Sequence, residues 1–286
     1  MNTRMKASLR CLVIASLAVF FLLGVYGSSV TLAKWVDIDR LVLPEGEVYK
    51  PSRIIMMAET EIHEIGFDLL TYLKTLDLSY YYDNLMEQMD DFEMCIKGYE
   101  EAVTDPEDKR NIAQVKQIYL ELKPLVLEIV HLGQRYSHLE RRFNRAVNKL
   151  DDLIDERVEF DLYCRPYDPE LKKMVGVVNL IECEVQQFAW RLTFFLETGD
   201  KNDKEMADDN FKQLESFVDE VMKFATSIQE KKFAYAAETM VLELKKISGD
   251  LVTKKSELRE KLGLFKSKMD SIDEIIDQDI QKDTHR

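Results

Sequence analysis

The chain has 286 residues, long enough for one large domain or two small ones, and a net charge of −14 with the acidic residues spread along its length. Proteins that bind nucleic acid present a basic face, so this charge argues against nucleic acid as a partner. Only 10 glycines and 6 prolines occur, while 46% of the residues are hydrophobic. So few turn-forming residues favour long helices over a β-rich fold.

The N-terminus predicts a targeting segment over residues 1–34. Arg4, Lys6 and Arg10 form a basic leader, and the 23 residues from Cys11 to Ala33 carry no charge. This layout fits a signal peptide cut after Ala33, and its length fits an uncleaved membrane anchor equally well. Because positive charges stay in the cytoplasm, both alternatives place the rest of the chain in the periplasm, anchored to the inner membrane or secreted.

Residues 35–50 follow as an irregular linker that contains Pro44 and Gly46. Beyond it, apolar residues recur in alternating steps of three and four, which is the rhythm of packed helices. The pattern predicts six helices, over residues 51–76, 79–103, 107–161, 170–198, 202–229 and 231–283. Pro124 should bend the third helix without ending it, since the apolar register continues past it. Gly199 should end the fourth.

Two of these helices, the third and the sixth, are about twice as long as the others, and the order short, short, long occurs twice. The segments YLKTLD (72–77) and FLETGD (195–200) end corresponding helices. Because short loops make consecutive helices antiparallel neighbours, the lengths predict two four-helix bundles stacked end to end. The fold class is therefore all-α, an elongated double four-helix bundle of six helices that shares two long antiparallel helices.

The predicted sensor-like domain, residues 51–283, divides into a proximal bundle (51–133 and 256–283) and a distal bundle (134–255). Gly133 and the Ser248-Gly249 pair mark the junction between them. The loops 75–82 and 198–203 should face each other there.

This arrangement resembles the helical bimodular sensor domain of methyl-accepting chemotaxis receptors and some sensor kinases, over about residues 45–283. The FLETGD segment is similar to a helix-end motif of helical sensor modules. The resemblance implies an extracytoplasmic domain that binds a small molecule, often an organic acid, or docks a periplasmic binding protein or receptor, and that forms a homodimer. Those receptors continue into a second membrane span and a signalling region, whereas this sequence ends at Arg286. A truncated receptor, or an envelope protein that only docks another protein, are therefore alternative expectations.

Cations beside the predicted apolar seam of the distal bundle are the candidate ligand-binding residues. Arg135, Arg142 and Lys149 recur every seven residues, and Arg191 holds the same flanking position on the fourth helix. Guanidinium groups grip a carboxylate with two parallel hydrogen bonds, which suits a small carboxylate ligand. The alternative is that these cations pair with acids of the bundle. For Arg191 such an acid has to come from another helix.

The proximal bundle has the opposite bias, with acids in the flanking positions: Glu61, Asp68, Glu121 and Glu128. We expect these carboxylates to be solvated. His63 lies between Glu61 and Glu64, but adjacent residues of a helix point apart, so we expect no metal site there.

The remaining motifs indicate no chemistry. No nucleophile elbow, phosphate loop, zinc signature or dinucleotide motif occurs, so we expect no enzyme and no cofactor. The cysteines lack the spacing of a disulfide framework and should be isolated thiols. His131, His138 and Arg145 recur at seven residues on the outward side of the third helix and predict a surface stripe.

Overall fold

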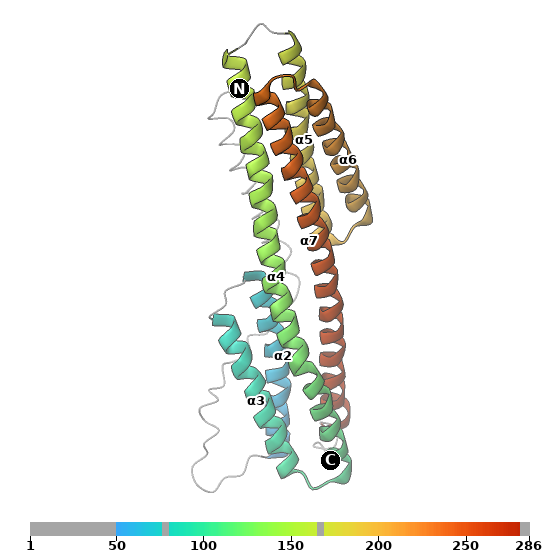
Figure 1. Cartoon of the computed structure of the whole chain (residues 1–286). Coiled ribbons are helices and arrows are strands. Elements are labelled where there is room, and N and C mark those ends of the chain that lie inside the picture. Colours follow the sequence, from blue (N-terminus) through green and yellow to red (C-terminus); the bar gives the residue numbers. More distant parts are fainter. Residues whose placement is uncertain (1–49, 76–79, 165–168, 281–286) are drawn as a thin grey trace, which may run out of the picture. The chain divides into compact units, whose positions relative to one another are not determined.

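The computed structural model describes residues 50–75, 80–164 and 169–280, which all fall within one compact unit. They form six α-helices, and no strand occurs among them (Figure 1). The helices are α2 (Pro51–Thr75), α3 (Tyr80–Ala102), α4 (Pro106–Cys164), α5 (Pro169–Thr198), α6 (Lys201–Phe224) and α7 (Ile228–Glu274). The predicted all-α, six-helix bundle is confirmed for this part of the chain.

The predicted leader and most of the linker, residues 1–49, lie outside the described residues, as do residues 76–79 of the predicted loop 75–82. Within the ranges that are described, no helix combines the length and the apolar character needed to cross a membrane.

The long helices α4 and α7 pack against each other in antiparallel fashion (Figure 1). Ion pairs between the two helices follow this antiparallel order: as the residue number rises along α4, the number of its partner on α7 falls. The pairs are Glu121–Lys268, Glu128–Lys261, Arg142–Glu243 and Arg157–Glu230. Helices α2 and α3 pack together and against α4. Helices α5 and α6 pack together, α5 against both long helices and α6 against α7. Among the described residues neither α2 nor α3 contacts α5 or α6, so α4 and α7 connect the two groups.

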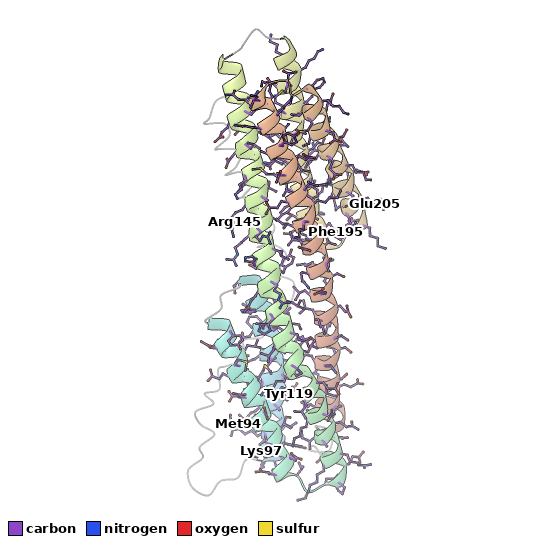
Figure 2. All side chains as sticks on the ribbon, in the orientation of Figure 1. Met94, Lys97, Tyr119, Arg145, Phe195 and Glu205 are labelled. Atoms are coloured by element: carbon purple, nitrogen blue, oxygen red, sulfur yellow. The ribbon has the colours of Figure 1, made fainter. Side chains whose placement is uncertain are left out.

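Buried apolar side chains form two separate clusters along α4 and α7. The proximal cluster unites α2, α3, residues 112–130 of α4 and residues 258–276. The distal cluster unites residues 143–154 of α4, helices α5 and α6, and residues 233–251 of α7. In the proximal cluster Tyr119, labelled in Figure 2, lies with its ring 4.7 Å from that of Phe92. Its hydroxyl donates a hydrogen bond to the Met89 carbonyl, so the one polar atom of this buried ring is satisfied.

Gly199 ends α5 as the sequence predicts. Its φ of 79° lies in the left-handed region, and its N–H donates to the Phe195 carbonyl at 2.7 Å. A Cβ at this position would lie 2.8 Å from Nη1 of Arg259 on α7, so close approach as well as backbone conformation requires glycine. Asp200 then caps α6 by accepting a hydrogen bond from the Asn202 N–H at 2.9 Å.

The predicted boundary between the fifth and sixth helices is wrong. Helix α6 ends at Phe224 instead of residue 229, and α7 begins at Ile228 instead of residue 231. Ser227 and Glu230 form a capping box, in which each side chain accepts a hydrogen bond from the backbone N–H of the other. The sequence carries this signal, a serine followed three residues later by glutamate. However, Ala225 continues the apolar spacing of α6, and that spacing predicts the longer helix.

Neither long helix breaks near the predicted junction. Helix α4 is continuous through Pro124 and Gly133, and α7 is continuous through Ser248 and Gly249. A Cβ at Gly133 would collide with Cδ2 of Leu73, so this glycine lets the end of α2 lie close against α4. After Glu274 the α-helical hydrogen bonding gives way to a π-helix, η2 (Ile275–Ile280), so the last long α-helix ends before the predicted residue 283.

Candidate functional site

A polar stretch of the α4–α7 pair separates the two apolar clusters. We call it the waist, and it comprises residues 131–142 of α4 and 252–257 of α7. Its apolar side chains are only partly buried: Leu132, Tyr136, Leu139 and Val252. Gln134 Nε2 donates to the Tyr72 hydroxyl at 3.0 Å and so ties the waist to α2. Helical bundles build ligand sites in this way, from side chains on facing helices where the apolar core is incomplete.

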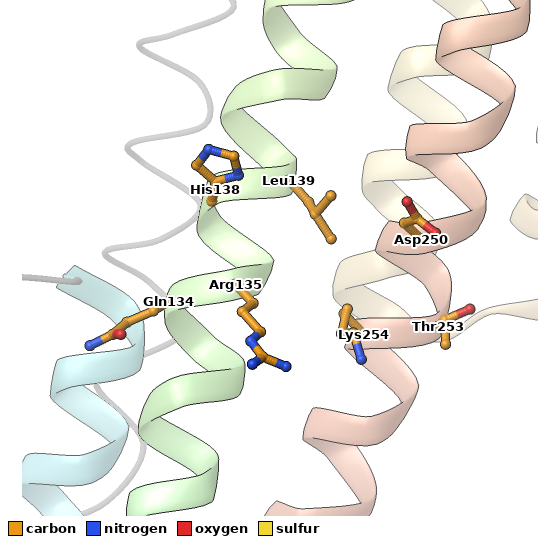
Figure 3. Close-up of a pocket in the computed structure, with 7 residues that line it drawn as sticks. All are labelled: Gln134, Arg135, His138, Leu139, Asp250, Thr253 and Lys254. Carbon is orange, nitrogen blue, oxygen red and sulfur yellow. The ribbon is translucent and has the colours of Figure 1, made fainter.

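A groove of about 600 Å³ opens at the waist between α4 and α7. Figure 3 shows Arg135 and Leu139 pointing from α4 toward α7. The full lining is Gln134, Arg135, His138, Leu139, Asp250, Thr253 and Lys254. A smaller hollow of about 360 Å³ follows toward the proximal cluster, lined by Glu128, His131, Leu132, Arg135, Glu257, Glu260 and Lys261. Arg135 lines both, so it lies where the two hollows meet.

Arg135 is a cation with no ion-pair partner within the part of the chain that the structure describes. The other cations of the two hollows are engaged, since Lys254 Nζ lies 2.6 Å from a Glu257 carboxylate oxygen and Lys261 Nζ lies 2.6 Å from one of Glu128. The Arg135 side chain is exposed, so its guanidinium donors can meet a ligand from solvent. Asp250 is an acid in the same lining, so the groove is not uniformly positive.

Further charged residues surround Tyr136 at the waist. The ammonium of Lys255 lies 4.8 Å from the centre of the Tyr136 ring, and burial, reinforced by nearby Arg259, lowers the pKa of Lys255. Arg259 Nη2 donates to the carbonyls of Leu196 and Glu197 at 3.0 and 3.1 Å. These carbonyls lie at the C-terminal end of α5, where a cation is favoured by the helix dipole. Arg259, two residues beyond the waist, thus ties α7 to α5, as Gln134 ties α4 to α2.

The four cations that the sequence singles out do not gather around one cavity. Arg135 lines the waist groove, whereas Arg142 pairs with Glu243 of α7 at 3.6 Å. Lys149 is exposed further along α4, and neither of the two hollows includes it. A ligand site built from all four residues therefore stays a prediction, and Arg135 is the member that lies at a cavity.

Arg191 on α5 is engaged by an acid from another helix, which is the alternative that the sequence left open. Its Nη1 lies 2.8 Å from Oδ1 of Asp203 on α6, and the Asp203 side chain is buried. The Arg191 guanidinium also lies 4.4 Å from the centre of the exposed Trp190 ring. The sequence could not name Asp203, because the pairing depends on how α5 and α6 are rotated against each other.

The prediction of solvated acids in the proximal bundle is wrong for Glu61 and Asp68. Their side chains are only 3% and 6% exposed, because α3 packs over this side of α2. Burial raises the pKa of Glu61 to about 7, and the carboxylates of Glu64 and Asp91 add to the rise. Burial raises the pKa of Asp68 as well. The spacing of apolar residues shows which line along α2 faces the core. It does not show how much of the helix surface beside that line, including Glu61 and Asp68, the neighbouring helix covers.

His131 and His138 are exposed, as the predicted surface stripe requires, but each also lines one of the waist hollows. The sequence of α4 gave no signal for this, because the hollows exist only where residues 250–261 of α7 face it. Cys95 and Cys183 are free thiols, as predicted.

Compared with known proteins, the chain matches no protein-family model and no curated protein. The fold and the waist define the class of protein as an all-helical bundle with a polar groove between its two longest helices. Because helical bundles host many functions, the function has to be inferred from the chemistry of that groove.

Proposed function

We propose that this protein is an extracytoplasmic, sensor-type domain that binds a small anionic molecule, such as an organic acid, at the waist. The observation that carries the proposal is Arg135, whose exposed guanidinium lines the groove without a carboxylate partner among the described residues. A ligand carboxylate can accept two parallel hydrogen bonds from this guanidinium. The groove volume of about 600 Å³ suits a small molecule.

The location and the signalling role rest on the sequence. The basic leader and the uncharged segment over residues 1–34 support export, and the resemblance to bimodular sensor domains supports a role in signal transduction. A ligand in the groove contacts α4 and α7 together. If two arrangements of these helices differ in the shape of the groove, the ligand binds them with different affinity and favours one of them, as a sensor requires.

A thermal-shift screen with small dicarboxylates tests the proposal. We expect at least one of them to raise the melting temperature of the wild-type protein, and we expect Arg135→Ala to weaken its binding tenfold or more. A hydrogen bond to a charged group contributes about 1.5–3 kcal/mol, and about 1.4 kcal/mol corresponds to a factor of ten in affinity. Isothermal titration of the same acid gives the dissociation constants.

Two control variants locate the site. Arg145→Ala removes an exposed arginine from the same helix, outside both hollows, and should bind like the wild type. Arg191→Ala breaks the pair with Asp203 and should lower stability without changing the ligand-induced shift. If binding is lost in Arg191→Ala but kept in Arg135→Ala, the anion site lies in the distal bundle and not at the waist. A screen in which no acid binds would reject the proposal.

A second candidate function, docking through a protein surface, is favoured by exposed apolar side chains on α2. Met56, Phe67 and Leu70 are spaced by eleven and three residues, so they lie on one side of the helix, and the Phe67 side chain is 69% exposed. Apolar side chains grouped in this way mark interaction surfaces more often than scattered ones do. The resemblance to sensor domains makes a second copy of this chain the partner that we propose for this face.

Sedimentation velocity over a range of concentrations tests self-association. We expect the wild-type protein to dimerise and Phe67→Glu to weaken the dimer at least tenfold, because burial of a phenylalanine contributes about 1.5–3 kcal/mol. Leu242→Glu, at an exposed leucine of α7, is the matched control and should dimerise normally. A wild-type protein that stays monomeric at every concentration, or equal behaviour of the two variants, would contradict the assignment of this face.

A further inference from the structure

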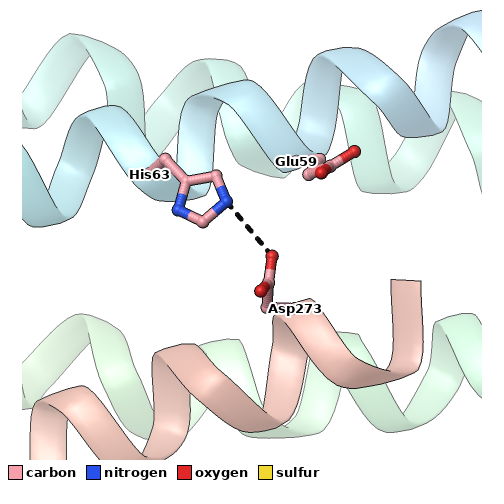
Figure 4. A group of neighbouring side chains, drawn as sticks. All are labelled: Glu59, His63 and Asp273. Atoms are coloured by element: carbon pink, nitrogen blue, oxygen red, sulfur yellow. Dashed lines mark ion pairs between the residues drawn. The ribbon is translucent and has the colours of Figure 1, made fainter. Parts of the chain in front are cut away.

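Three side chains with metal-binding atoms meet between α2 and the end of α7. Glu59 and His63 are four residues apart and therefore lie on the same face of α2, and Asp273 comes from the last turn of α7 (Figure 4). One ligand atom from each residue lies within 4.8 Å of the other two. We propose that Glu59, His63 and Asp273 form a binding site for a divalent transition-metal ion, with Zn²⁺ as the representative ion.

The distance between the histidine and the aspartate fits such an ion. His63 Nε2 lies 3.2 Å from Oδ1 of Asp273. Two ligand atoms at about 2.0–2.1 Å from a tetrahedral zinc ion lie about 3.3 Å from each other. These two atoms are therefore already spaced as neighbouring zinc ligands, whereas the Glu59 oxygen lies within 4.8 Å of both and has to move closer to bind the same ion.

The surroundings of the three residues permit an ion to enter. The side chains of His63 and Asp273 are 60% and 35% exposed, so the site opens to solvent. Oδ1 of Asp273 is shielded from water and accepts no hydrogen bond from the described residues, although it lies beside the imidazole. A metal ion bound between the two side chains supplies the missing partner for this oxygen.

The types of ligand select the class of ion. An imidazole nitrogen with two carboxylates suits Zn²⁺ and similar transition metals, whereas Ca²⁺ and Mg²⁺ prefer oxygen ligands alone. Two carboxylates balance the charge of a divalent ion when the histidine is neutral. Three protein ligands leave a fourth position for water, so the site is open and not a closed structural one.

This site differs from the segment 61–64, for which the spacing of residues on a single helix predicts no metal site. Glu61 and Glu64 flank His63 in the sequence but point to other sides of α2, whereas Glu59 is one turn away on the same side. The third ligand, Asp273, belongs to a helix near the other end of the chain. The site shares no residue with the waist groove or with the apolar face of α2. A test of metal binding is therefore independent of whether the proposed anion binds or the proposed dimer forms.

Competition between the full chain and a chromogenic chelator for Zn²⁺ tests the inference. We expect one Zn²⁺ ion per chain, and we expect His63→Ala to weaken binding at least tenfold because it removes the nitrogen ligand. His131→Ala removes an exposed histidine from α4 and is the matched control, which should bind like the wild type. His285, outside the described residues, is present in all variants and therefore adds the same background to each.

Two further measurements keep the result interpretable. Asp273→Asn keeps the side-chain shape but weakens a ligand, so it should reduce Zn²⁺ affinity while circular dichroism shows an unchanged fold. Ca²⁺ added at the same concentration should leave the melting temperature unchanged, whereas Zn²⁺ should raise it. Equal Zn²⁺ affinity in His63→Ala and His131→Ala, or a Ca²⁺ effect as large as that of Zn²⁺, would overturn the proposal.

Discussion

Replacing Glu230 with alanine is expected to lower the free energy of unfolding by about 3–5 kcal/mol, the largest effect that we predict for a single side chain. Glu230 is buried at the start of α7 and lies 3.7 Å from the buried guanidinium of Arg157. Its carboxylate also accepts hydrogen bonds from the backbone N–H groups of Thr226 and Ser227. The substitution therefore removes a helix cap and leaves Arg157 in an apolar region without this carboxylate. Urea unfolding followed by circular dichroism measures the loss.

The matched control for this experiment is Glu243→Ala on the same helix. Glu243 also pairs with an arginine of α4, Arg142, but the two side chains are about half exposed, so its loss should cost less than about 1 kcal/mol. Adding Arg157→Met to Glu230→Ala should recover part of the stability, because an apolar side chain of similar length replaces the buried charge. A cost for Glu230→Ala no larger than that of Glu243→Ala would show that burial of the pair has little energetic effect.

The free energy of unfolding is expected to fall by up to about 3 kcal/mol between pH 4.5 and pH 8 because of Glu61 alone. Burial raises the pKa of this carboxyl from 4.5 to about 7 in the folded protein, while the unfolded chain ionises near 4.5. Ionisation is therefore easier in the unfolded state. The stabilising contribution is fully present below pH 4.5 and is lost as the pH rises through 7. Urea unfolding at pH 5 and at pH 8 measures the difference.

Glu61→Gln should remove this part of the pH dependence, since an amide does not ionise in this range. The slope will not vanish, because burial also raises the pKa of Glu64, Asp68 and Asp91 in the same region. Glu156→Gln, at an exposed acid of α4, should keep the full wild-type slope. If Glu61→Gln and Glu156→Gln show the same pH dependence, Glu61 is ionised in the folded protein throughout.

The helices and their seams could be predicted from the sequence because they depend on local spacing. Apolar residues every three or four positions identify the side of a helix that is covered, and the predicted seam residues Val115, Leu122 and Ile129 are all buried. The boundary at Ser227 was predictable as well, from its capping box. It was missed because the apolar spacing at Ala225 gave the opposite indication.

The sites could be predicted only in part because they depend on which residues of distant helices face each other. The sequence identifies Arg135 as a cation beside the seam, but the groove around it needs Asp250, Thr253 and Lys254 of α7. Likewise the sequence predicts no metal site at His63, because it does not show that Asp273 of α7 lies beside this histidine. The rotation of each helix about its own axis and its alignment with the partner helix determine such pairs, and neither is encoded in the periodicity of a single helix.

The division of the apolar interior into two clusters affects how the protein tolerates substitutions. Leu122 in the proximal cluster and Leu214 in the distal cluster share no buried neighbour, since no residue belongs to both clusters. Losses of unfolding free energy at such separated positions add, whereas losses at touching residues are coupled. Each half of the molecule can therefore accumulate or repair substitutions on its own. Evolution can remodel the distal cluster while the cluster that α2 and α3 help to form keeps its packing.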